Sequence, residues 1–299
     1  MELVIRPKLF WQSKLVLLAV LPVAGADLVL QGHWYAEQIP AVALAALGLS
    51  ALLGLLTWKL RAATPRASVT GAAITASLIF STSMPPYQPW RTALLPVLAV
   101  ALVAHLATRL GRKRKEQLGL SEGRHGRTTA QICANLGLAM LAATPVLQSL
   151  LLDSGWFTRA TFIPMPLFAV PLAALAEAAA DTVSSELGQV FGGRPRLITT
   201  LRAVEPGRDG AISLTGTLAG IVAAGIVAAL GAWAVQGDLF LFAIAVGGGV
   251  FGLLFDSVLG ATLEELKWLN NDAVNFLSTA AAAAFALAML ALLPHLGIR

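Results

Sequence analysis

Charged residues and cysteine are scarce in this sequence. Only 12% of its 299 residues are charged, about half the share in an average soluble chain, and its single cysteine, Cys133, has no partner for a disulfide bond within the chain. Hydrophobic residues make up 57% of the chain, and the mean hydropathy is +0.75. This composition excludes a soluble globular domain, a disulfide-stabilised scaffold and a disordered chain.

The sequence also lacks the short motifs of several enzyme classes. It contains no Walker A sequence, no H-E-x-x-H and no C-x-x-C. P-loop and zinc-protease chemistries are therefore unsupported, and any active site has to be found among scattered polar residues.

Long apolar runs recur between Leu15 and Leu293. Because a helix needs about 20 apolar residues to cross the hydrocarbon core, these runs predict an all-α polytopic membrane protein with about nine transmembrane helices. The first run resembles a signal peptide, but it continues to Leu30, so we expect an uncleaved span. Serine and threonine dilute the third span, which we expect to be buried or partial. The expected spans are 15–30, 41–58, 68–83, 92–110, 130–152, 162–188, 212–235, 239–259 and 273–293.

The basic residues are distributed unevenly between the two sides of this topology. With a cytoplasmic N-terminus, every lysine and arginine except Arg91, Arg159 and Arg299 falls in a cytoplasmic segment, as the positive-inside rule requires. The net charge of +5 therefore orients the protein in the bilayer, and we expect no nucleic-acid partner. We divide the chain into a two-helix N-terminal extension, residues 1–64, and a membrane catalytic domain, residues 65–299, with cytoplasmic loops at 111–129 and 192–211.

Acidic residues occur inside the sixth predicted span, where a charge is costly unless it is paired or hydrated. Glu177, Asp181 and Ser184 lie on one helical face with Gly188, whereas Glu186 is about 140° round from Asp181. Two carboxylates one turn apart repel each other unless a cation or proton lies between them, and hard oxygen ligands suit Mg²⁺. The alternative is that this is the cytoplasmic end of the span, where charged side chains reach water.

A second intramembrane carboxylate, Asp256, follows a glycine-rich run. The run matches G-x-G-x-x-G from Gly247 to Gly252, but no strand precedes it, so it does not indicate a dinucleotide site. Pairs of glycines four residues apart favour close helix packing, which we expect to bring Asp256 towards Asp181. These pairs are Gly248 with Gly252, Gly188 with Gly192, and Gly216 with Gly220.

Polar residues also open the ninth predicted span. Asn270 or Asn271 suits an N-cap and Asp272 suits the first turn, whereas Asn275 and Ser278 extend the same face into an apolar helix. Both a helix cap and a ligand shell therefore remain open. We interpret Asp27 and His105, which are lone polar residues in their spans, as structural.

Six segments resemble the integral-membrane family named domain-of-unknown-function family 92, which includes the plant phytyl-phosphate kinases. The resemblance covers about residues 65–293. A wider likeness to CTP-using membrane enzymes, the CDP-diacylglycerol synthases and polyprenol kinases, rests on Asp181-Thr182 followed by Gly188, Phe191 and Gly192. Ser184-Ser185 replaces the Ala-Tyr of the synthase signature, which disfavours the synthase reaction. The six segments are 111–119, 180–188, 195–200, 210–217, 256–262 and 271–275.

The resemblance implies a kinase that transfers the γ-phosphoryl group of CTP, or of another nucleoside triphosphate, to an isoprenyl monophosphate of the phytyl or geranylgeranyl type. It implies Mg²⁺ as the divalent cation, and an active site on the cytoplasmic side of the cell inner membrane. The alternatives are a lipid-phosphate cytidylyltransferase, a lipid-phosphate transporter or flippase with Glu177 and Asp181 as a proton-coupled pair, and a scaffold protein.

The resemblance and the residue chemistry together assign four groups of candidate site residues. The catalytic group is Asp181, Glu186, Asp256 and Asn271, and the metal ligands are Glu177, Asp181, Asp256 and Asp272. The nucleotide-binding group is Thr182, Ser185, Arg194, Arg196, Thr199, Thr200, Arg202 and Ser213. The group for the acceptor phosphate is Lys113, Arg114, Arg124, Arg127 and Asn275.

Overall fold

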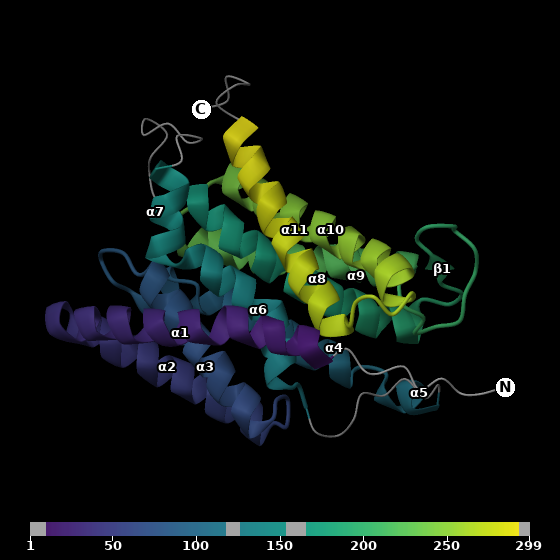
Figure 1. Ribbon diagram of the computed structural model, residues 1–299, viewed down its shortest axis with the longest axis horizontal. Helices are drawn as coiled ribbons and strands as arrows, with labels where there is room; N and C mark the ends of the chain where they lie inside the picture. The colour runs from purple at the N-terminus through teal and green to yellow at the C-terminus, as the bar shows by residue number, and fades with distance from the viewer. Residues whose placement is uncertain (1–9, 118–125, 154–165, 293–299) are drawn as a thin grey trace.

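A computed structural model of the protein describes residues 10–117, 126–153 and 166–292 and forms a helical bundle (Figure 1). The helices of its first half are α1 (Phe10–Gln38), α2 (Pro40–Lys59), α3 (Pro65–Thr82), α4 (Leu94–Arg109), α5 (Arg112–Gln117), α6 (Thr129–Ala143) and α7 (Pro145–Asp153). Those of its second half are α8 (Ala169–Phe191), α9 (Leu214–Ala234), α10 (Leu239–Leu259) and α11 (Asn271–Leu292). Short 3-10 turns lie at η1 (Pro89–Arg91) and η3 (Pro166–Phe168), and a π-helical turn, η4 (Gly260–Glu264), extends α10. Strands β1 (Arg196–Leu197) and β2 (Ala211–Ile212) pair antiparallel.

Among the described residues, five helices are long and apolar enough to cross a bilayer: α1, α2, α9, α10 together with η4, and α11. The pair α6 and α7 makes a sixth candidate, bent by 56°. The protein is therefore a multi-pass membrane protein. The nine-span topology and the cytoplasmic N-terminus stay predictions, because α4 has 16 residues, α3 is rich in hydroxyl groups and α8 has three acidic residues.

The fifth predicted span, 130–152, is not one straight helix. Thr144 leaves the helical conformation, with ψ at 138°, and Pro145 begins the next helix. Proline has no N–H to donate and disfavours a helical residue before it, so the sequence itself causes the break. The sixth predicted span begins later than expected, since α8 starts at Ala169 and residues 162–165 lie outside the described residues.

Helix α8 is the centre of the bundle. Its residues from Ala169 to Ala180 are all buried, and it packs against α4, α6, α9, α10 and α11. Alanines fill most of this stretch, so neighbouring helices approach closely on several sides. The acidic residues of α8 therefore lie on the central helix of the bundle, where neighbouring helices separate them from lipid.

The expected glycine contacts join α8 to α9 and α10. A methyl group on Gly216 would lie 3.0 Å from the Gly188 Cα and 2.7 Å from the Ser184 carbonyl oxygen, so only glycine permits this distance between α8 and α9. A methyl group on Gly248 or Gly249 would contact alanines of α8 at 2.8 or 2.9 Å. The predicted use of the glycine pairs in helix packing is confirmed.

Helices α1 and α2 pack onto the rest of the chain. Gln12 Nε2 of α1 donates to the Trp268 carbonyl oxygen at 2.7 Å, and the Ser13 hydroxyl donates to Asp272 at 2.5 Å. Helix α2 packs on α3, and α1 also contacts α3 and α6 (Figure 1). Asp27 accepts hydrogen bonds from Gln31 and Ser77, in agreement with its structural interpretation. The division of the chain at residue 64 stays a prediction.

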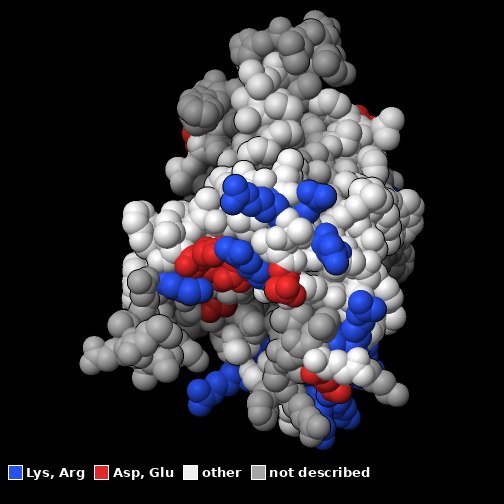
Figure 2. Space-filling model, turned by 90° about the vertical axis from the view of Figure 1, so that its right-hand side faces the viewer, with Lys and Arg blue, Asp and Glu red and all other residues white. Residues whose placement is uncertain are grey.

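Strand β1 and helix α5, which contains the basic run 112–115, lie at one end of the bundle, which we call the charged end (right in Figure 1). Figure 2 shows this end face-on, with acidic side chains flanked by lysines and arginines. The functional candidates lie at this end, and its cytoplasmic assignment stays a prediction.

Candidate functional site

A cavity of about 240 Å³ opens at the charged end of the bundle, among α6, α8, α10, the start of α11 and the loop before α9. We call it the acidic cavity, because five carboxylates line it and two arginines accompany them. The carboxylates are Asp181, Glu186, Asp209, Asp256 and Glu264, and the arginines are Arg127 and Arg208.

Asp181 and Asp256 meet across this cavity from two different helices. Asp181 interacts with the Arg127 guanidinium and the Ser185 hydroxyl, and Asp256 lies within electrostatic range of Asp181. The Oδ2 atom of Asp256 is buried and has no hydrogen-bond partner among the described residues. The glycine run of α10 allows this approach, as predicted, because it removes side chains from the α8 and α11 contacts.

Glu177 lies one turn deeper in α8 and does not line the acidic cavity. Its side chain is 1% exposed and packs against α10, where a methyl group on Gly252 would lie 2.5 Å from the Glu177 Cγ. Its Oε1 atom also lacks a hydrogen-bond partner in the described part of the chain. The buried oxygens Glu177 Oε1 and Asp256 Oδ2 therefore need a proton or a cation to offset the cost of burying their charge.

The residues present fit a magnesium ion bound together with phosphates. Within residues 10–117, 126–153 and 166–292, no group of three or more His, Cys, Asp or Glu residues is placed to hold a metal by itself. Asp272 accepts a hydrogen bond from Ser13 and lies outside the cavity lining, so the predicted ligands are not all brought together. Mg²⁺ at phosphoryl-transfer sites usually takes one or two carboxylates and completes its shell with phosphate and water oxygens. The pair Asp181 and Asp256 matches that donor set.

Three of the predicted nucleotide-binding residues line the acidic cavity: Thr182, Ser185 and Ser213. The Arg127 guanidinium donates to the Thr182 hydroxyl at 3.2 Å. The Ser213 hydroxyl caps α9 by accepting from the Gly216 N–H at 3.1 Å.

The other predicted nucleotide-binding residues are exposed and do not line the acidic cavity. They are Arg194, Arg196, Thr199, Thr200 and Arg202. The arginine of this loop that lines the cavity is Arg208, which the sequence did not single out. It donates to Glu265 Oε1 at 2.5 Å, and this hydrogen bond, with the charge of Arg208, holds the pKa of Glu265 below its usual value.

Glu186 is tied to α4 and α5. It accepts from the Thr108 hydroxyl at 2.8 Å and forms an ion pair with Lys115, whose side chain is 4% exposed. Lys115 Nζ also donates to the Ala107 carbonyl oxygen at 3.2 Å. The pairing of Lys115 with Glu186 was not predicted, because nothing in the basic run 112–115 distinguishes Lys115 from its neighbours.

Of the residues predicted for the acceptor phosphate, Arg127 and Asn275 line the acidic cavity, and Arg114 is exposed and does not line it. Arg124 and the Lys113 side chain lie outside the described residues. The two roles considered for the polar residues at the start of α11, helix cap and ligand shell, belong to different residues. The Asn270 side chain caps the helix by accepting from the Ala273 N–H at 2.9 Å, whereas Asn271 and Asn275 line the cavity.

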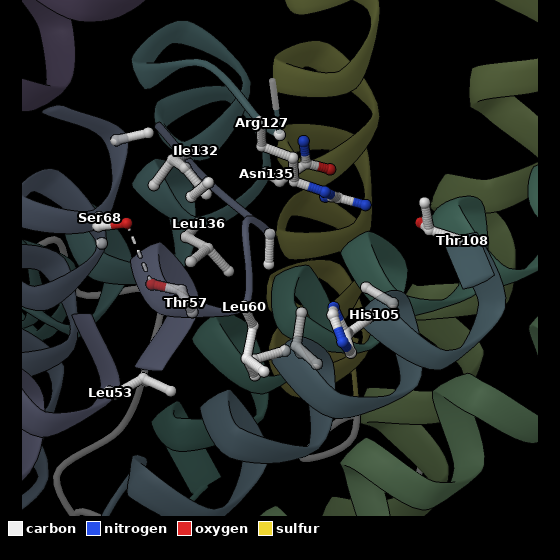
Figure 3. Close-up of a pocket in the computed structure, with 18 of the residues that line it drawn as sticks. Leu53, Thr57, Leu60, Ser68, His105, Thr108, Arg127, Ile132, Asn135 and Leu136 are labelled. Carbon is white, nitrogen blue, oxygen red and sulfur yellow. Dashed lines mark hydrogen bonds between the residues drawn. The ribbon is translucent and has the colours of Figure 1, made fainter. Parts of the chain in front are cut away.

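A second cavity, of about 540 Å³, lies between α2, α3, α4 and α6 (Figure 3). We call it the apolar cavity, because aliphatic residues and glycines together make up most of its lining. It shares Arg127, Asn135 and Glu186 with the acidic cavity, so the two adjoin. Figure 3 labels Arg127 and Asn135 among the residues that line it. Sequence analysis did not anticipate this cavity.

The fold and these two cavities define a multi-pass membrane protein with a buried acidic site beside an apolar one. The chain belongs to the family described as Integral membrane protein DUF92, which it matches over residues 48–283. The family predicted from the sequence is therefore confirmed.

Several proteins are similar to this chain over part of their lengths. An uncharacterized membrane protein of Methanocaldococcus jannaschii is 43% identical over 108 residues, which are 36% of this chain and 45% of that protein. One of Synechocystis is 34% identical over 66% of this chain and 73% of its own length. Protein VTE6, chloroplastic, of Arabidopsis thaliana is 30% identical over 62% of this chain and 54% of its own length. The chain thus spans about half the length of two of these relatives, those of Methanocaldococcus jannaschii and Arabidopsis thaliana. No solved structure matches it.

Proposed function

We propose that the protein is a membrane kinase that transfers the γ-phosphoryl group of CTP, or of another nucleoside triphosphate, to an isoprenyl monophosphate. The observation that carries the proposal is the adjacency of the acidic and apolar cavities, with Arg127 lining both. A phosphorylated lipid needs such a pair, because its chain requires an apolar site beside a polar site for the reacting groups. Membership of the DUF92 family, which the resemblance described above connects with the plant phytyl-phosphate kinases, supports the same reaction class.

The acidic cavity suits the phosphate end of a magnesium-bound nucleotide. Its carboxylates would repel bare phosphates, so Asp181 and Asp256 act through a divalent cation. When bound, Mg²⁺ would neutralise charge on the β- and γ-phosphates. A cavity of about 240 Å³ holds the phosphates and leaves the nucleoside to extend towards the exposed loop with Arg194, Arg196 and Arg202.

The acceptor needs positioning more than activation. Its phosphate oxygen attacks the γ-phosphorus, the bond from that phosphorus to the β-bridging oxygen breaks, and CDP and the isoprenyl diphosphate form. Since the acceptor phosphate is already ionised, no strong general base is required. Arg127 is suited to hold that phosphate, because its guanidinium, fixed by Thr182, offers paired donors.

A double-label experiment tests the reaction. Detergent-purified protein is incubated with Mg²⁺, with phytyl, geranylgeranyl or farnesyl monophosphate, and with CTP labelled at either the γ or the α phosphorus. Label from the γ position in an isoprenyl diphosphate, with release of CDP, supports the kinase. Label from the α position in the lipid would instead identify a cytidylyltransferase.

Failure of both labels to enter any acceptor would contradict an enzyme and favour the lipid-phosphate transporter. ATP, GTP and UTP in the same assay measure the nucleotide preference. We also propose that the reaction takes place on the cytoplasmic side of the cell membrane. Access of a membrane-impermeant thiol reagent to a cysteine placed at Thr199 in sealed vesicles tests this, because Thr199 is exposed at the charged end.

A further inference from the structure

We infer that the apolar cavity binds the isoprenyl chain of the acceptor, and that the small residues of α4 on its wall limit the length of that chain. The inference rests on the proposed function for the identity of the headgroup. The proposed ligand is a single-chain isoprenyl monophosphate, with its chain in the apolar cavity and its phosphate at Arg127.

The wall of the apolar cavity is built from one face of each of four helices. On α4 the lining residues Val97, Val100, Ala101, Ala104 and Thr108 follow the three- and four-residue spacing of a single helical face. Similar faces come from α2 (Leu53, Gly54 and Thr57), α3 (Gly71, Ala72 and Thr75) and α6 (Ile132 and Leu136). The volume of about 540 Å³ lies within the range of about 300–1,000 Å³ for sites that hold one small ligand.

The hydroxyl groups on this wall are already hydrogen-bonded within the protein. Thr57 donates to the Ser68 hydroxyl at 3.2 Å (Figure 3), and Thr75 donates to the Gly71 carbonyl oxygen at 2.7 Å. Such groups offer little to a polar ligand and cost little when a hydrocarbon covers them. The interior of the cavity is therefore suited to an apolar chain.

The mouth of the cavity has the opposite character. The cavity lining contains five arginine and lysine residues, besides His105, and one carboxylate, Glu186, which Lys115 neutralises. A phosphate monoester complements this charge, and arginine binds phosphate through paired N–H groups. Arg127 lines both cavities, so a phosphate held there lies beside the site of Asp181 and Asp256. The basic residues are Arg61, Arg109, Arg112, Lys115 and Arg127.

Helix α4 runs along the depth of the apolar cavity. Its lining face runs from Thr108 near the mouth to Val97, a helical rise of about 16 Å. Ala101 lies between them, and its methyl side chain leaves room for the chain to continue inward. A larger side chain at this position blocks the inner part of the cavity while leaving Arg127 unchanged.

The variant Ala101→Phe tests the chain-length limit, and Leu102→Phe is its matched control. Leu102 is the next residue of α4, is 58% exposed on the outer surface and does not line the cavity. We expect the ratio of kcat/KM for geranylgeranyl to that for geranyl monophosphate to fall about tenfold or more in Ala101→Phe and to stay unchanged in Leu102→Phe. An unchanged ratio in Ala101→Phe, with the protein folded, would overturn the inference.

Photo-crosslinking of the unmodified protein tests the chain site without activity and without a variant that has to fold. The probe is a geranylgeranyl monophosphate with a photoreactive group at the far end of its chain. We expect labelled peptides from α3 and α4, competed by unlabelled geranylgeranyl monophosphate and not by phosphatidylglycerol. Labelling elsewhere, or competition by phosphatidylglycerol, contradicts the inference, and the latter would identify the cavity as a bilayer-lipid site. Specific labelling without phosphoryl transfer would overturn the proposed kinase and keep the chain site.

Discussion

The Arg127 guanidinium and the Thr182 hydroxyl are hydrogen-bonded at 3.2 Å where the acidic and apolar cavities adjoin. The backbone of Arg127 is also fixed, because its N–H donates to the Ala62 carbonyl oxygen and its carbonyl oxygen accepts from the Thr64 N–H. Gly126 allows this contact, since a methyl group there would lie 2.7 Å from the Arg61 carbonyl oxygen. Arg127, which lies at the junction of the two cavities, is therefore held in place by hydrogen bonds of both its backbone and its side chain.

Replacing Arg127 with alanine is expected to weaken acceptor binding. The KM for the isoprenyl monophosphate should rise about tenfold or more, because a charge-assisted hydrogen bond contributes roughly 1.5–3 kcal/mol. Steady-state kinetics with the acceptor varied at saturating nucleotide provide the measurement. The control is Arg114→Ala, which removes an exposed arginine that lines neither cavity. Equal effects of the two substitutions would remove Arg127 from the acceptor site.

Asp256→Asn should abolish most phosphoryl transfer without unfolding the protein. We expect a loss of about a hundredfold or more in kcat, because contacts to a catalytic metal supply several kcal/mol of charge stabilisation. The matched control is Asp238→Asn at the opposite end of α10, where the side chain caps the helix and asparagine caps equally well. If Asp256→Asn keeps full activity, the acidic cavity is not the reaction site.

The Lys115–Glu186 ion pair predicts an asymmetric response to substitution. Lys115→Met should destabilise the protein by about 3 kcal/mol, because it leaves a largely buried carboxylate without its partner. The double variant Lys115→Met with Glu186→Gln should recover part of that loss, since no uncompensated charge remains. Thermal unfolding in detergent of the unmodified protein, of Lys115→Met, of Glu186→Gln and of the double variant gives the coupling energy. A double variant no more stable than Lys115→Met would show that the pair is not coupled.

The contact between α8 and α9 predicts different outcomes for two glycines of α9. Gly216→Ala should destabilise the protein by about 1–3 kcal/mol, because the new methyl group meets the backbone of α8. Gly225→Ala has no neighbour within 4 Å and should be neutral or stabilising by up to about 1 kcal/mol. Parallel thermal unfolding curves measure both. Similar melting temperatures would contradict the close packing of α8 against α9.

The ion pair of Arg208 with Glu265 predicts a pH dependence of nucleotide binding. The hydrogen bond from Arg208 lowers the pKa of Glu265, so the pair is complete above the ordinary carboxyl range and is lost as the pH falls through the lowered value. Because Arg208 lines the acidic cavity, where we propose that the phosphates of the nucleotide bind, we expect the KM for the nucleotide to rise as the solution becomes acidic. In Glu265→Gln the KM should already be a few-fold higher at neutral pH and should depend less on acid.

The control for this prediction is Glu116→Gln, which removes an exposed carboxylate paired with Arg112 on α5, outside the acidic cavity. Its nucleotide KM should follow the pH profile of the unmodified protein. A profile in Glu265→Gln that matches the unmodified protein would show that Glu265 does not position Arg208.

Local sequence signals predicted the helices and part of the site. Apolar runs located the helices because lipid and helix packing both select apolar side chains over about 20 residues. The glycine pairs predicted the packing of α8 with α9 and α10, and with it the approach of Asp256 to Asp181. Both signals depend on residues close together in one helix.

The remaining features depend on how distant segments meet. Sequence reasoning assigned Arg194, Arg196 and Arg202 of the loop 192–211 to the nucleotide and left out Arg208, but the fold brings Arg208 to the acidic cavity and leaves the other three exposed. Lys115 pairs with Glu186 because α5 packs against α8. This tertiary contact has no signal in the local sequence. The apolar cavity needs four helices to present small residues to one another, which no single helix reveals.

The burial of α8 also has a consequence for how the protein is assembled in the membrane. On its own, this helix would bring Glu177 and Asp181, which lie near its middle, into contact with lipid, at a cost of about 2.5–3.5 kcal/mol for each charge near the bilayer centre. Helices α9 and α10, which follow it in the chain, are apolar and cover two of its sides. We therefore expect stable insertion of α8 to wait for the synthesis of the helices that shield it.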